Sequence, residues 1–156
     1  MAITMKDVRA RLDPDEVDYL KARKLGPEAI PFLMELVQGG DLGLASKAAY
    51  LASMILSPRS LAVLKKAAES KEAVVRVAAA SAIRNLSEAN AAKVMEMMGN
   101  DPDAGVRKVV LKSASRFKSP RLAAKVQKMA EKDPEPFLRD LAAGAVKEMK
   151  IKKKQK

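Results

Sequence analysis

Apolar residues recur along this chain with helical spacing, and the pattern itself repeats about every thirty residues. Positions 27, 58, 89 and 120 mark equivalent points in four copies, each 31 residues after the last. In every copy the positions three, six and nine residues later are apolar, which predicts a buried stripe on a first helix. These positions are Ile30, Leu33, Leu36, Leu61, Leu64, Ala67, Ala92, Met95, Met98, Ala123, Val126 and Met129.

A second apolar stripe, with small residues at its centre, follows in each copy and predicts a second helix. In the first copy this stripe runs from Ala45 to Leu56. No segment alternates with a period of two, so we expect negligible strand. Helical pairs this short must stack on their neighbours to bury their apolar faces. The sequence therefore predicts an all-α, right-handed α-solenoid of four hairpins, with second helices on the concave side, at residues 26–56, 57–86, 87–118 and 119–150.

Polar residues stand where the second helices should begin, and we expect their side chains to cap those helices. Prolines at 102 and 134 then fall at the first helical position, where a missing N–H costs nothing. Glycines at 39, 40 and 99 favour closing the first helices with left-handed backbone. The expected caps are Asp41, Ser70, Asp101 and Asp133.

One motif recurs at the start of the second helices. Residues 101–107 and 133–139 read Asp-Pro-Asp-Ala-Gly-Val-Arg and Asp-Pro-Glu-Pro-Phe-Leu-Arg; residues 70–76 are similar with Ser for Asp, and 41–47 are a degenerate copy with Lys for Arg. The motif resembles the second-helix signature of HEAT repeats, over roughly residues 26–150. Bilin-lyase-type HEAT proteins are similar in repeat pattern, but no residue here singles out their chemistry. The resemblance implies a binding solenoid, in a family of scaffolds, transport factors, nucleic-acid binders and a few enzymes.

The two ends of the chain depart from the repeat. Residues 48–56 are apolar on nearly every side, and Tyr50 and Met54 fall off the stripe. We expect residues 1–25 to form a helical cap over them, since an open stack needs a cover; the alternative is a protein-binding or self-association patch at these two residues. Residues 151–156 carry a block of like charge and predict a basic flexible tail.

Composition narrows the chemistry. The chain has no Cys and no His, which excludes thiol and imidazole catalysis and the usual zinc ligands. We expect no enzymatic activity, no cofactor and no metal. The first residues lack the apolar core of a secretory signal, and no apolar run reaches membrane-spanning length. The expectation is therefore a cytoplasmic protein without a membrane span, most simply a monomer.

Charge is uneven along the chain. Residues 1–56 carry 7 basic and 8 acidic groups, net −1, whereas residues 57–156 carry 23 and 11, net +12. This basic half should attract an acidic protein or peptide, or alternatively nucleic-acid phosphates without sequence preference. The sequence offers only five aromatic residues for base stacking, which favours the protein partner. The candidate residues for binding an anionic partner are Arg84, Arg107, Lys108, Lys112, Arg116 and Lys147.

Three arginines recur at one position of the repeat and form a separate group. They are Arg76, Arg107 and Arg139. Along a stacked surface they would make a basic ladder for a ligand. In HEAT repeats, an Arg at this place commonly pairs with the Asp that begins a second helix, so the resemblance implies cross-bracing between repeats instead. Both interpretations stay open at the level of sequence.

Overall fold

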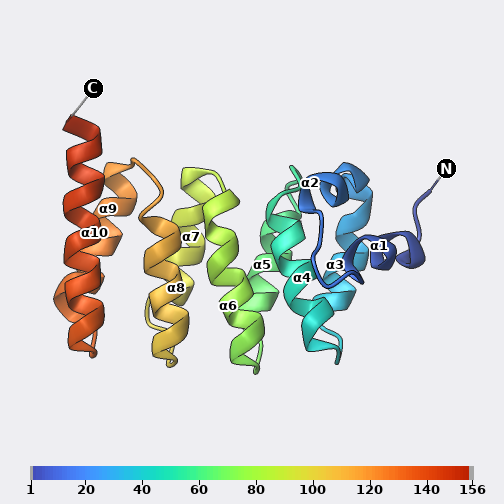
Figure 1. Ribbon diagram of the computed structural model, residues 1–156, viewed down its shortest axis with the longest axis horizontal. Helices are drawn as coiled ribbons and strands as arrows, with labels where there is room; N and C mark the ends of the chain where they lie inside the picture. The colour runs from blue at the N-terminus through green and yellow to red at the C-terminus, as the bar shows by residue number, and fades with distance from the viewer. Residues whose placement is uncertain (1, 155–156) are drawn as a thin grey trace. The chain divides into compact units, whose positions relative to one another are not determined.

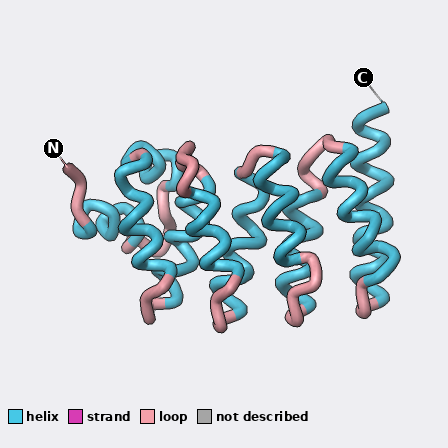
Figure 2. Tube along the Cα trace, turned by 180° about the vertical axis from the view of Figure 1, so that it is seen from behind, coloured by secondary structure: helices cyan, strands magenta, loops and turns pink. Residues whose placement is uncertain are grey.

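A computed structural model describes the backbone of residues 2–154 and the side chains of residues 2–150 (Figure 1). Helices joined by short loops make up the described residues, and none of these forms a strand (Figure 2). The predicted all-α helical-repeat fold is thereby confirmed. The chain divides into two compact units, residues 1–82 and residues 83–156, which are described separately.

The first unit contains an N-terminal segment and two helical hairpins. Two layers form, because α3 packs beside α5 and α4 packs beside α6. Buried Leu33, Leu64 and Val75 lie in the core, together with small alanines that let the helices approach closely. The elements are α1 (Met5–Leu12), α2 (Tyr19–Ala22), η1 (Arg23–Leu25), η2 (Pro27–Ala29), α3 (Ile30–Val37), α4 (Leu42–Ser53), α5 (Ser60–Ala68) and α6 (Ala73–Ala82).

The N-terminal segment packs against the first hairpin, where α1 contacts α3 and α4. Its α1 begins with a capping box between Thr4 and Asp7. The Tyr19 and Tyr50 rings meet edge to face with centroids 4.8 Å apart. Lys47 of α4 donates from Nζ to the carbonyl oxygen of Leu12 at 3.0 Å and to that of Pro14 at 2.9 Å. These contacts hold the segment over the half-buried Tyr50.

The second unit repeats the two-layer arrangement. First helices α7 and α9 pack together, and second helices α8 and α10 pack together. Leu111, Leu122 and Leu138 are fully buried between the layers. The elements are η3 (Ile83–Asn85), α7 (Glu88–Met98), α8 (Ala104–Ala114), α9 (Pro120–Lys132) and α10 (Pro136–Lys154).

The helix ends correct several expectations. Asp41 caps α4 as predicted, but α8 is capped by Asp103, not Asp101. Asp101 and Asp133 each accept instead from the backbone N–H two residues later, at 2.9 Å, and Ser70 does the same at 3.1 Å. These are turns ahead of the helix. The prolines at 102 and 134 therefore lie outside the helices.

Two other details of the sequence interpretation are wrong. Leu56 is 97% exposed, because α4 ends at Ser53 and the stripe does not reach it. Among the described residues, positive φ occurs only at Gly26, so the glycines at 39, 40 and 99 close their helices without left-handed backbone. The predicted tail, residues 151–156, lies outside the residues whose side chains are described, although the backbone of α10 continues to Lys154.

Candidate functional site

The three repeated arginines lie in the interior or against the backbone. Nη1 of Arg76 donates to the carbonyl oxygen of Ser70 at 3.0 Å, Nη1 of Arg107 to that of Asp101 at 2.8 Å, and Nη1 of Arg139 to that of Asp133 at 2.6 Å. Each bond spans six residues and ties the second helix to the turn before it. The same geometry at three copies supports a structural role for these arginines within each repeat.

Arg107 adds a link between successive repeats of the second unit. Its Nε lies 2.9 Å from Oδ2 of Asp133, and its Nη2 lies 3.2 Å from Oδ1. The side chains are only 7% and 1% exposed. The hydrogen bond to Asp133 raises the pKa of Arg107, so the guanidinium stays charged. Although Arg107 was among the candidates for partner binding, its guanidinium is engaged internally.

Lys47 does not belong to the ladder, contrary to the alignment of residues 41–47 with the repeated motif. The burial patterns of α4 and α8 match when Asp41 is aligned with Asp103. In this alignment Ala45 corresponds to Arg107. In this register Lys47 corresponds to Val109. Its ammonium reaches the N-terminal segment instead of the turn before its own helix.

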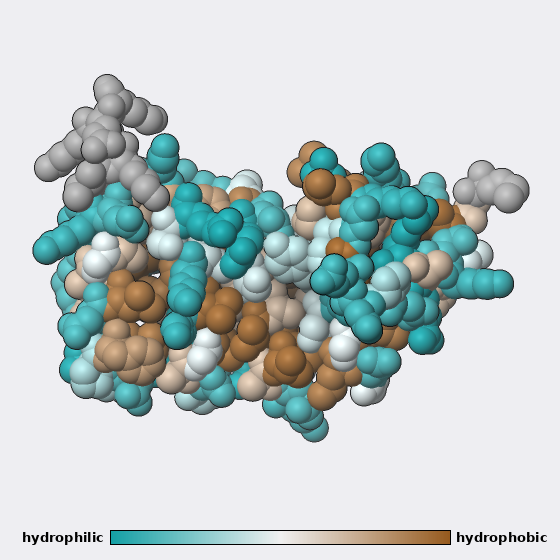
Figure 3. All heavy atoms as spheres, viewed as in Figure 1, coloured by the Kyte–Doolittle hydropathy of each residue, from teal (hydrophilic) through white to brown (hydrophobic). Residues whose placement is uncertain are grey.

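Exposed cations along α8 and the turn after it form a stripe that we call the α8 basic face. It consists of Lys108 and Lys112 on α8 and of Arg116, two residues beyond its end; they are four residues apart and all exposed. On neighbouring α10 the apolar side chains of Phe137 and Leu141 are 53% and 36% exposed. Figure 3 shows hydrophobic surface between hydrophilic side chains on this side of the second unit. The combination is a cationic surface with an exposed apolar neighbour.

The two remaining predicted residues are not part of this stripe. Lys147 is exposed on α10, but six helical residues place it roughly 120° around the axis from Leu141. Arg84 is half-buried in η3, the short helix before α7. The structure therefore groups three of the six predicted binding residues, two on α8 and one in the turn after it.

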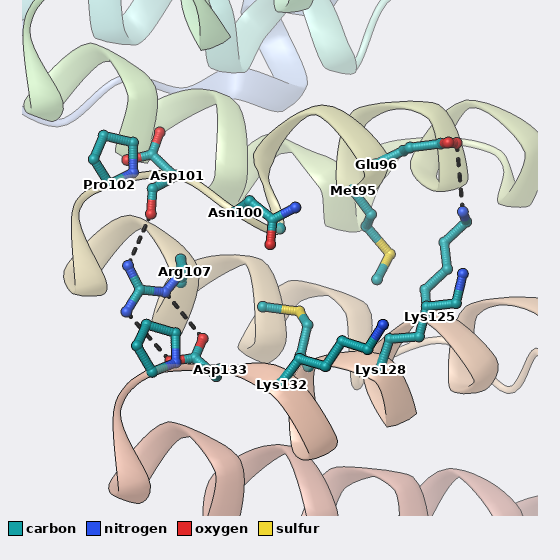
Figure 4. Close-up of a pocket in the computed structure, with 13 residues that line it drawn as sticks. Met95, Glu96, Asn100, Asp101, Pro102, Arg107, Lys125, Lys128, Lys132 and Asp133 are labelled. Carbon is teal, nitrogen blue, oxygen red and sulfur yellow. Dashed lines mark hydrogen bonds and ion pairs between the residues drawn. The ribbon is translucent and has the colours of Figure 1, made fainter.

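A groove between α7 and α9 escaped the sequence analysis; we call it the α7–α9 groove. It has a volume of about 520 Å³ and is lined on its α9 side by Lys125, Lys128 and Lys132 (Figure 4). Nζ of Lys125 lies 3.5 Å from Oε2 of Glu96, on α7. The loops that precede α8 and α10 close the other end, at the Arg107–Asp133 pair.

A sequence signal for the groove exists in the spacing of α9. Arg121, Lys125, Lys128 and Lys132 lie four, three and four residues apart, within a sector of roughly 60° on one helix face. The binding residues predicted from the sequence include none of these four first-helix cations.

A comparable groove lies in the first unit, between α3 and α5, with a volume of about 530 Å³. Its charged lining residues are two lysines and two glutamates, namely Lys66, Lys71, Glu69 and Glu72. A groove at this place thus recurs in both units, but only the second unit lines it with an excess of lysine from a first helix.

The described residues contain no group of three or more His, Cys, Asp or Glu that could hold a metal ion. None of the helices in that part of the chain is both long and apolar enough to cross a membrane. A family model for HEAT repeats matches residues 69–147, about half of the chain. No curated protein matches the sequence.

Proposed function

Because the chain belongs to the HEAT-repeat family, whose members generally serve as protein-interaction scaffolds, we propose that it is a non-enzymatic binding module for an acidic protein segment. The segment binds across α8 and α10. Solenoids use surfaces of this kind, built from adjacent repeats, to hold extended partners.

The observation that carries the proposal is the pairing of two kinds of exposed side chain on adjacent helices. The α8 basic face supplies positive charge from Lys108, Lys112 and Arg116, while Phe137 and Leu141 expose apolar surface on α10. Large exposed apolar side chains are typical of protein-binding surfaces, and cations beside them select an acidic partner. An amphipathic acidic segment satisfies both.

The alternative partner is nucleic acid, favoured by the absence of any acidic residue between Ala104 and Met129. Phosphate binding needs positive charge but gains nothing from exposed Leu141. Of five aromatic residues in the chain, Phe137 is exposed, whereas Tyr19, Phe32, Tyr50 and Phe117 are half-buried, which leaves few platforms for base stacking. An acidic protein segment therefore ranks first.

A binding assay with two probes tests the proposal. One probe is a fluorescently labelled peptide of alternating glutamate and leucine, and the other is a labelled duplex DNA of mixed sequence. We expect peptide binding that weakens at least roughly tenfold in the triple variant Lys108→Glu/Lys112→Glu/Arg116→Glu, the size expected when three exposed ion pairs are lost. Phe137→Ser should weaken it as well, because it removes the apolar contact.

The matched control reverses three exposed lysines of the first unit, Lys65→Glu/Lys66→Glu/Lys71→Glu, which changes net charge by the same amount. This control should bind the peptide almost as the native protein does. If both triple variants bind the peptide equally weakly, the loss of affinity comes from net charge alone, and this result would contradict the proposal. DNA binding with a log–log salt slope near −0.9 for each contacted phosphate, and no peptide binding, would favour the alternative.

A further inference from the structure

We propose that the α7–α9 groove is a second ligand site, which binds a short acidic peptide segment independently of the α8 basic face. Its volume of about 520 Å³ falls within the range of roughly 300–1,000 Å³ typical of ligand pockets. None of the residues that make up the α8 basic face lines it.

The first argument is a departure from the repeat at Lys125. Five residues after the start of each first-helix frame, the other three copies carry Phe32, Val63 and Val94, and the two valines are fully buried. The fourth copy places a lysine at this packing position. Because a lysine contributes less to a repeat core than a valine, repeat packing does not explain this choice.

The second argument is the balance of charge inside the groove. Four cations and three carboxylates line it. The Asp133 carboxylate is already paired with Arg107, Glu96 faces Lys125, and Asp101 accepts the N–H of Asp103 at the loop end. Neither Lys128 nor Lys132 has an ion-pair partner among the residues that the structure describes. Figure 4 shows both side chains extending along the groove. Two ammonium groups are thus available for ligand carboxylates.

The third argument concerns the wall between these charges. Met95 and Met129 line the groove while remaining 3% and 8% exposed, and Pro102 and Pro134 line it at the loop end. Thioether side chains adapt to apolar groups of varied shape. Asn100 points into the same space and offers an amide for a peptide backbone (Figure 4). The groove therefore suits a segment that carries both carboxylates and an apolar side chain.

The groove of the first unit supports the assignment by contrast. It has nearly the same volume, but its two lysines are offset by two glutamates. The fold alone therefore produces the concavity without the excess of cations. Of these two grooves, only the one lined by α9 carries three lysines, as expected of a feature that recognises a ligand rather than one that stabilises the stack.

Methyl spectroscopy of the full chain tests this site directly. The protein is labelled with ¹³C at its methionine methyl groups, and the signals are assigned with Met95→Leu and Met129→Leu. The probe is an acetylated, amidated hexapeptide of alternating glutamate and leucine. We expect saturable shifts of the Met95 and Met129 signals, and a roughly tenfold loss of affinity in Lys128→Glu/Lys132→Glu, which replaces two attractions with repulsions.

Two controls separate this site from the proposed function. Lys108→Glu/Lys112→Glu should leave the two methyl shifts unchanged, and a hexapeptide of alternating serine and leucine should not produce them. The inference is overturned if the Met95 and Met129 signals do not move, if the serine peptide moves them equally, or if reversal on α8 abolishes the shifts while reversal on α9 does not. Shifts produced by duplex DNA and not by the acidic peptide would likewise overturn it.

Discussion

Removal of the Arg107 guanidinium should destabilise the protein more than any change of a surface cation. In Arg107→Met the apolar stem is retained, but the Asp133 carboxylate, 1% exposed, loses its charged partner. The carbonyl oxygen of Asp101 loses its 2.8 Å hydrogen bond at the same time. Breaking one side of a buried ion pair costs about 3–5 kcal/mol. That is a large part of the total stability of a domain, which is about 5–15 kcal/mol.

Arg139→Met is the matched control, since Arg139 is half-buried and donates to the carbonyl oxygen of Asp133. Losing one hydrogen bond from a charged donor costs about 1.5–3 kcal/mol, and less where water replaces it. Urea unfolding followed by circular dichroism should therefore give a clearly lower free energy of unfolding for Arg107→Met than for Arg139→Met. The two variants share the chemistry of the substitution, so the difference isolates the buried pair.

A double-variant cycle completes the test. In the native protein, Oδ1 of Asp133 accepts the N–H of Glu135 at 2.9 Å. Asp133→Asn keeps an oxygen for this bond but removes the negative charge. In Arg107→Met/Asp133→Asn neither charge is left unpaired, so the double variant should be more stable than the sum of single losses by about 0.5–3 kcal/mol. Strict additivity, or equal losses in the two methionine variants, would refute the cross-bracing account.

Two further predictions concern the N-terminal segment. Burial, with a smaller contribution from Tyr50, raises the pKa of Tyr19 above 10.0, so its contribution to stability is present below pH 10.0 and is lost as the pH rises above that value. The chain has two tyrosines and no tryptophan, so an absorbance titration of Tyr50→Phe should give a Tyr19 midpoint above 10.0; a midpoint at or below 10.0 would contradict the burial. Lys47→Met should lower the free energy of unfolding by about 1.5–3 kcal/mol, because two carbonyl oxygens lose a charged donor. It should also speed trypsin cleavage at Arg9 and Arg11, and an unchanged rate would show that the two bonds do not hold the segment.

The fold could be predicted from the sequence because apolar periodicity reports directly on burial. Leu33, Leu64, Met95 and Val126 occupy one position of the repeat, and all four are buried. Helix ends were less predictable. An Asp before a helix can cap it by accepting the N–H three residues later, as Asp41 does. It can also accept the N–H two residues later and form a turn ahead of the helix, as Asp101 does, and the sequence alone does not distinguish the two.

The candidate site was only partly predictable, since sequence gives the helix face of a residue but not the space in front of it. The four-residue spacing of Lys108, Lys112 and Arg116 puts them along one side of α8 and the turn after it. It did not reveal that Phe137 and Leu141 are exposed on the adjacent helix. The stripe position of Leu141 is half-buried at Ala78 and Val109 in the second and third copies. The α7–α9 groove depends on contacts between two repeats, which a stripe within one helix does not report.

In this helical repeat, the charged residues that recur differ in their contacts from a charged residue that departs from the pattern. Arg107 recurs with Arg76 and Arg139, and the structure assigns these arginines to backbone and carboxylate contacts that the stack needs in every copy. Lys125 stands alone among Phe32, Val63 and Val94, and it lines a groove. The periodic charges in this chain are therefore accounted for by the stack. Lys125 is not, since packing gives no reason for a charge at a position that elsewhere packs the core, and this is why we propose the groove as a ligand site.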